Sequence, residues 1–182
     1  MSVLDIVNYG DPILRKKCSS VEDFTTLPSF VDDMFDTMYE EEGLGLAANQ
    51  VGVDMNLFII DIAHTDDNEF PRVFINGEII SSEGESVFSE GCLSIPQVSL
   101  EVTRPETITY KFQDLKKQWH QEKFDGLLAR AIQHEMDHLN GILIIDIVSD
   151  LQMSKVQSEV KKIKNESISK IKSNISDKRF VL

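Results

Sequence analysis

The chain has 182 residues, of which 41% are hydrophobic and 27% are charged, so it holds enough apolar material for one globular domain with a full core. No apolar run approaches the length that spans a bilayer, and the first residues lack the basic and apolar regions of a signal peptide. These features argue against a membrane protein and lead us to expect a cytoplasmic one.

The net charge of −13 is divided unevenly along the chain. Residues 155–182 hold 8 Lys/Arg and 3 Asp/Glu (+5), which leaves 10 Lys/Arg and 28 Asp/Glu (−18) for residues 1–154. The acidic body should repel nucleic acids such as DNA and anionic membranes, whereas the basic tail could approach them. A solvated helix face explains the tail equally well. We expect one catalytic domain at 1–150 and a basic helix and tail at 151–182, packed on that domain or extending from it.

The first predicted element is a helix at residues 27–38, because apolar side chains recur there at helical spacing. A loop of small residues follows at 43–50. Apolar or alternating stretches then predict a series of strands, with a polar turn at 65–69 and a break at Gly77. The predicted strands are 56–62, 72–76, 78–82, 98–102, 108–112 and 119–124.

A second helix is predicted at residues 127–139, opened by Gly126. Its core-facing residues should be Leu128, Ile132 and Leu139. After an apolar segment at 142–148, strand or irregular, a last helix should start near residue 150. The whole pattern predicts an α+β fold, in which short antiparallel strands wrap around a central metal-bearing helix, with one helix N-terminal and one C-terminal to them.

The central helix carries the H-E-x-x-H pattern of zinc-type sites, from His134 through Glu135 to His138. Two histidines four residues apart project from one face of a helix, so both imidazoles can bind one metal ion. Glu135 can reach a water on that metal. Leu127 and Ala131 share the stripe of the histidines, which favours a substrate with a hydrophobic group near the reacting bond.

A catalytic metal site needs a third protein ligand. The metzincin pattern would put it at Ile144, whose side chain cannot bind metal. Asp146, Glu159 or Glu166 could serve an H-E-x-x-H metallopeptidase that cleaves peptide bonds, but no motif supports them. Upstream, Cys92 follows a glycine and offers sulfur, a strong ligand for a borderline ion. A non-enzymatic zinc domain would need four protein ligands, and only three candidates stand out.

At this point three ordered stretches resemble the peptide deformylase family. Residues 43–50 look like G-x-G-x-A-A-x-Q, residues 90–94 look like E-G-C-L-S, and residues 133–138 look like Q-H-E-x-D-H. The resemblance extends over about residues 5–150 and has the spacing of the common bacterial form.

The resemblance implies a metal centre and a reaction. Cys92, His134 and His138 would hold one divalent ion, Fe(II) in most native members, and Zn(II), Ni(II) or Co(II) would also fit. The reaction removes formate from the N-formylmethionine that begins a nascent protein, using a water that the metal activates. The substrate partners are therefore N-formylmethionyl nascent peptides.

The remaining site residues follow from the same resemblance. Glu135 would take the proton of the attacking water and deliver it to the leaving amine. The side-chain amide of Gln50 and the backbone N–H of Leu93 would stabilise the oxyanion. The apolar pocket for the methionine side chain would consist of Leu44, Leu127 and Ala131. The backbone at Gly45 and Gly91, with the segment after Ser94, would pair with the substrate peptide.

Three polar residues near these motifs have weaker assignments. Glu90 and Asp137 could accept hydrogen bonds from the ligand imidazoles, or form a salt bridge or a cap. Arg130 lies beside the histidine stripe and could touch the substrate, but we expect it at the surface.

Overall fold

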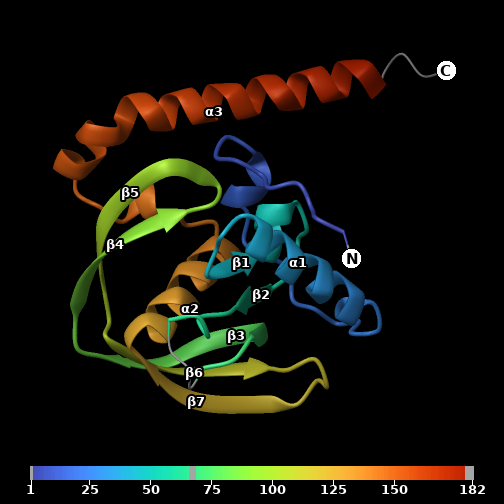
Figure 1. Cartoon of the computed structure of the whole chain (residues 1–182), viewed down its shortest axis with the longest axis vertical. Coiled ribbons are helices and arrows are strands. Elements are labelled where there is room, and N and C mark those ends of the chain that lie inside the picture. Colours follow the sequence, from blue (N-terminus) through green and yellow to red (C-terminus); the bar gives the residue numbers. More distant parts are fainter. Residues whose placement is uncertain (1, 66–68, 179–182) are drawn as a thin grey trace.

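Two antiparallel sheets surround a central helix in the computed structural model, which describes residues 2–65 and 69–178 (Figure 1). The larger sheet has the strand order β1-β2-β3-β6-β7, and the smaller one pairs β4 with β5. Helix α1 precedes the strands, α2 packs against the larger sheet, and α3 follows as a long C-terminal helix. The predicted α+β class, with helices on both sides of the strands in sequence, is confirmed.

The boundaries of the elements are as follows. The α-helices are α1 (Leu27–Glu40), α2 (Gly126–Leu139) and α3 (Asp150–Lys178). The strands are β1 (Gly45–Ala47), β2 (Leu57–Ile60), β3 (Arg72–Glu83), β4 (Ser86–Cys92), β5 (Ile95–Arg104), β6 (Thr107–Gln113) and β7 (Trp119–Asp125). The short 3₁₀ helices are η1 (Pro12–Arg15), η2 (Ala48–Val51) and η3 (Ile144–Asp146). None of the described helices is long and apolar enough to cross a membrane.

The sheet core, which lies between the larger sheet and α2, fixes the position of α2. Inward-pointing rings such as Phe74 and Phe112, whose centroids are 4.7 Å apart, form its floor. Leu128, Ile132 and Leu139 of α2 pack on this floor and are at most 5% exposed, as predicted. Each such side chain contributes about 1.5–3 kcal/mol by its burial. The histidines of α2 therefore project from a helix that its opposite face holds in place.

Two further cores flank the central helix. The α1 core lies between α1, β1 and β2, and its buried members include Val31, Met34, Leu46 and Leu57. The α3 core lies between β5, α3 and the segment before α3, and its buried members include Val98, Leu100, Val160 and Ile163. Figure 1 shows α3 running above β4 and β5 and then past the N-terminal segment. Each core thus supports a different wall of the space in front of α2.

The structure differs from several sequence predictions. β3 is one strand from Arg72 to Glu83, not two strands separated at Gly77. β4 was not predicted, because its side chains do not alternate between buried and exposed; only Glu90 in it is buried. The small-residue loop at 43–50 contains β1 and most of η2, and the segment 142–148 contains η3. The expected polar turn at 65–69 lies partly outside the described residues, and residues 179–182 lie wholly outside them.

Gly77 continues β3 because the missing side chain makes room for Tyr110. A Cβ at residue 77 would overlap the hydroxyl and ring of Tyr110, which is fully buried in the sheet core. The pairing of β3 with β6 shifts register between Ile75 and Glu78, so the irregularity lies at the same place. The glycine that seemed to end a strand therefore accommodates a close contact inside one.

We predict that Gly77→Ala destabilises the fold by about 1–3 kcal/mol, because the new methyl group forces Tyr110 out of its packed position. Urea unfolding followed by circular dichroism measures this change. Ser82→Ala, at an exposed position of the same strand, is the matched control and should stay within about 0.5 kcal/mol of the parent. Equal stability of the two variants would contradict this account of Gly77.

Candidate active site

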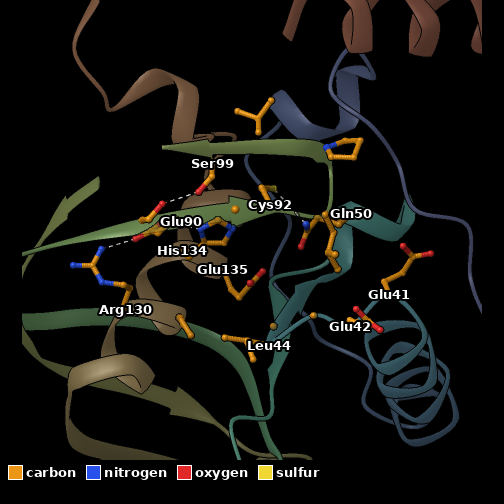
Figure 2. A pocket seen from close by; sticks show the side chains of 18 of the residues that line it. Glu41, Glu42, Leu44, Gln50, Glu90, Cys92, Ser99, Arg130, His134 and Glu135 are labelled. Atoms are coloured by element: carbon orange, nitrogen blue, oxygen red, sulfur yellow. Dashed lines mark hydrogen bonds and ion pairs between the residues drawn. The ribbon is translucent and has the colours of Figure 1, made fainter. Parts of the chain in front are cut away.

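Helix α2 places His134 opposite Cys92, which ends β4 (Figure 2), and brings His138 to the same cluster. His134 and His138 lie one turn apart, with ring centroids separated by 5.1 Å. Sγ of Cys92 is 3.2 Å from Nε2 of His138. One ligand atom from each of the three residues lies within 4.8 Å of the other two. The structure therefore brings together the three candidate ligands that the sequence suggested, from segments more than forty residues apart.

This donor set fits a divalent ion. A tetrahedral ion with bonds of about 2.0–2.3 Å holds its ligand atoms roughly 3.4–3.6 Å apart, which is compatible with the observed cluster. Nδ1 of His134 lies 3.0 Å from Oε2 of Glu90, so Nε2 is available to an ion. Burial lowers the pKa of His138 well below its usual value and keeps the imidazole neutral, the form that binds metal.

Glu90 is the buried carboxylate that connects these elements, and it is 7% exposed. It accepts hydrogen bonds from Nε of Arg104 at 2.7 Å, Nη1 of Arg130 at 2.6 Å and Nδ1 of His134 at 3.0 Å. Burial opposes its ionisation, but the hydrogen bonds from His134 and Arg104 outweigh that effect and lower the pKa of Glu90 to about 2. The site therefore contains a fixed negative charge directly behind His134.

The structure decides between the alternatives for the neighbouring polar residues, and the expectation for Arg130 is wrong. Arg130 is not at the surface but 6% exposed, because Glu90 and the backbone of Ser86 and Val102 bind its guanidinium. Asp137 forms the salt bridge that was the alternative for it, because Nη1 of Arg104 donates to it at 2.7 Å. The imidazole acceptor is Glu90, one of the two residues considered for this role.

Glu135 points into the space in front of the histidines (Figure 2). Burial raises the pKa of its carboxyl to about 7, and the charge of His134 opposes this shift. Its Oε2 atom has no hydrogen-bond partner in the described part of the chain. Gly45 on β1 lies directly against it, since a Cβ at residue 45 would be 3.0 Å from Cδ of Glu135. A buried carboxyl with an unused oxygen is a suitable proton acceptor for a molecule bound here.

Gln50 and Leu93 are both neighbours of Cys92, the first in space and the second in sequence. Ala47 donates its N–H to Oε1 of Gln50 at 2.8 Å, which turns the amide NH₂ group toward the site. Nε2 of Gln50 then lies 3.3 Å from Oγ of Ser94 and 3.9 Å from Sγ of Cys92. Leu93 occupies the turn between β4 and β5. The amide group and the Leu93 backbone are therefore both near the cysteine.

A cavity of about 710 Å³ opens in front of these groups, a size suited to a small ligand or a peptide end. Its lining includes every residue that was predicted to bind substrate: Leu44, Gly45, Gly91, Leu127 and Ala131. The predicted reactive groups reach the same cavity: Gln50, Cys92, Leu93, His134 and Glu135. His138 lies behind them and is 1% exposed.

Sequence reasoning missed other residues of the site. Phe88 lines the cavity and is 56% exposed, but β4 gave no alternation that would have indicated its direction. Glu41 and Glu42, at the end of α1, lie across the cavity from β4 (Figure 2). Arg104 holds both Glu90 and Asp137, and no motif marks it.

Comparison with known proteins agrees with this geometry. Residues 3–154 match the family model described as polypeptide deformylase. The chain is 44% identical over 164 residues to a peptide deformylase of Afipia carboxidovorans, covering 89% of this chain and 96% of that one. The crystal structure of a peptide deformylase from Legionella pneumophila matches with a TM-score of 0.82 at 40% identity, covering 92% of this chain and 98% of that chain. The crystal structure of peptide deformylase from Thermus thermophilus matches with a TM-score of 0.84 at 35% identity, covering 91% of this chain and 99% of that chain. The chain therefore belongs to the polypeptide deformylase family.

Proposed function

We propose how the deformylase reaction, the hydrolysis of the formyl group from N-formylmethionine at the start of a nascent protein, is divided among the residues of this site. The observation that carries the proposal is the convergence of a Cys-His-His donor set, a buried glutamate with an unused oxygen and an inward-facing amide on one cavity. The enzyme is a metal-dependent hydrolase, as its family is.

Cys92, His134 and His138 would hold the metal ion. When bound, a divalent ion supplies a Lewis acid that polarises the formyl carbonyl and makes a water nucleophilic near neutral pH. We propose Fe(II) as the native ion, with Zn(II), Ni(II) and Co(II) as alternatives, because a His₂Cys set accepts all four and supply decides among them. Glu90 supports the set by fixing the ring of His134 through Nδ1.

Glu135 would carry the proton. Its carboxylate accepts the proton of the attacking water and then donates it to the nitrogen of methionine as the C–N bond breaks. Burial raises the pKa of Glu135 to about 7. This suits the second step, because a carboxyl group with such a pKa can donate its proton near neutral pH. A bound cation would shift this balance toward the carboxylate, which suits the first step.

Gln50 and Leu93 would stabilise the negative charge that develops on the formyl oxygen. A side-chain amide and a backbone N–H remain donors at any pH, and both lie beside Cys92. Loss of one such donor typically costs about 2.7–4 kcal/mol of transition-state stabilisation. The hydrogen bond from Ala47 to Oε1 of Gln50 holds the amide in the donating orientation before substrate arrives.

The substrate would bind as an extended peptide. Leu44, Leu127 and Ala131 form the apolar wall for the methionine side chain, and the backbone at Gly45 and Gly91 pairs with the peptide backbone. Backbone pairing is independent of sequence, which suits an enzyme that acts on most new proteins. The alternative, a metallopeptidase with a downstream ligand, lacks support because Ile144 is buried and apolar while Asp146 pairs with Arg15.

We predict that the metal-loaded protein releases formate from formyl-Met-Ala and leaves the peptide bond of unformylated Met-Ala intact. Formate is measured by a coupled dehydrogenase assay and peptide cleavage by chromatography, with the metal kept reduced. Glu135→Gln should lower kcat by about 10²–10⁴-fold, because the proton carrier is lost. Cys18→Ala, at the other cysteine, should leave kcat unchanged. Cleavage of Met-Ala, or no formate release by the loaded parent, would contradict the proposal.

We also propose where in the cell the enzyme acts and what its C-terminal tail binds. We propose that the enzyme acts in the cytoplasm, where nascent chains emerge and where its two free cysteines stay reduced. Residues 1–150 would form the catalytic domain. Residues 151–182 would reach the ribosome, because exposed lysines such as Lys161, Lys170 and Lys172 line α3.

We predict that the triple variant Lys161→Glu, Lys170→Glu, Lys172→Glu weakens binding to purified ribosomes and flattens its dependence on salt, because fewer phosphate contacts remain. Cosedimentation at several KCl concentrations measures both. The control reverses three exposed lysines of the β6–β7 hairpin instead, Lys116, Lys117 and Lys123. Equal binding by the α3 variant and the parent would remove the ribosome proposal without affecting the deformylase assignment.

A further inference from the structure

The N-terminal segment crosses directly between the two loops that carry the proposed oxyanion donors. The N–H of Val7 donates to the carbonyl of Gln50 at 2.7 Å, and the N–H of Tyr9 donates to the carbonyl of Ser94 at 2.8 Å. Gln50 is itself one donor residue, and Ser94 follows the other, Leu93. Alternate amides of one extended segment thus bind the backbone at both donors.

The main chains of these two loops continue into different hydrophobic cores. Gln50 lies in η2, whose Ala48 is buried in the α1 core, whereas Ser94 precedes Ile95, which is buried in the α3 core. The loops also touch through side chains: Leu93 packs on the α1 core, and Nε2 of Gln50 lies 3.3 Å from Oγ of Ser94 and 3.9 Å from Sγ of Cys92. Side-chain contacts of this kind adjust to small movements, so a shift of one core relative to the other would change the separation of the two donors unless the main chains of the loops were also joined.

The segment is anchored in both cores and against α3. Ile6 packs on the α1 core and Tyr9 on the α3 core. Oγ of Ser167 donates to the carbonyl of Asn8 at 3.1 Å. Gly10, with φ of +120°, lies so close to α3 that a Cβ there would be 2.7 Å from the carbonyl oxygen of Lys164. The backbone of residues 7–9 is therefore also held by contacts outside the two loops.

We propose that Val7 and Tyr9 are positioning residues, whose backbone amides set the distance between the Gln50 amide and the Leu93 N–H. The inference rests on the proposed function, in which those two groups bind the oxyanion. Since the donors act on charge that develops only in the transition state, a change in their separation lowers kcat and leaves KM unchanged. A misplacement of 1 Å in such a group can cost about 10²-fold in rate.

The test replaces single amides by esters, which removes the N–H and keeps the side chain. Cys18 allows a synthetic peptide of residues 1–17 to be ligated to residues 18–182 without changing the sequence. Ester bonds are placed at the N–H of Val7, of Tyr9 or, as the matched control, of Asn8, whose N–H has no hydrogen-bond partner among the described residues. All proteins are refolded with the same divalent metal, and kcat and KM are measured per bound ion, so incomplete folding does not affect the comparison.

The Val7 and Tyr9 esters should each lower kcat by about 10-fold, less than the loss of a whole donor in Gln50→Ala, with KM and metal content unchanged. The Asn8 ester should match the all-amide ligated protein. Ser167→Ala tests whether the Tyr9 ester acts through the weakened Asn8 carbonyl, and it should lower kcat less than the Tyr9 ester does, because Ile6 and Tyr9 still anchor the segment. An unchanged kcat in the Val7 ester, or an equal loss in the Asn8 ester, would overturn the inference. Failure of the all-amide protein to release formate would instead count against the proposed function.

Discussion

The buried carboxylate of Glu90 is the interaction on which the site depends. It lies on β4 and binds Arg104 of β5 together with Arg130 and His134 of α2. These bonds attach the β4–β5 hairpin, which carries Cys92, to the helix that carries both histidines. Burying such charges is costly, and removal of one partner from a buried pair typically destabilises a protein by about 3–5 kcal/mol. The network therefore fixes the relative position of two elements that no main-chain pairing joins.

The three hydrophobic cores hold in place the elements that this network connects. The sheet core fixes α2, the α1 core fixes the loop with Gln50, and the α3 core fixes the hairpin with Cys92. The cavity opens where the three meet. Each reactive group is thus placed by a different part of the fold, and ionic and backbone contacts at the junction set the distances between the groups. Glu135 gains its buried position in the same way, because Gly45 lets β1 approach it.

The sequence predicted the parts of the site that depend on local periodicity. His134 and His138 share a face because a helix has 3.6 residues per turn, and this holds whatever packs around them. Arg130 was misplaced, because its direction depends on Glu90, forty residues away. β4 gave no strand signal, because its side chains face a cavity and solvent instead of one core. Gly77 seemed to break a strand, because the ring of Tyr110 that occupies its space comes from another strand. The periodicity of the sequence could not predict contacts that depend on the tertiary structure.

Metal affinity in Glu90→Gln tests the central claim most directly. The glutamine keeps the size of the side chain but removes the charge that Arg104, Arg130 and His134 bind. Competition with a chromophoric chelator gives the dissociation constant of Co(II) or Zn(II), and Glu101→Gln, at an exposed position of β5, is the control. The account predicts affinity weakened by about 10–100-fold in Glu90→Gln alone. Equal metal affinity in Glu90→Gln and the parent protein would show that the carboxylate does not hold the site together.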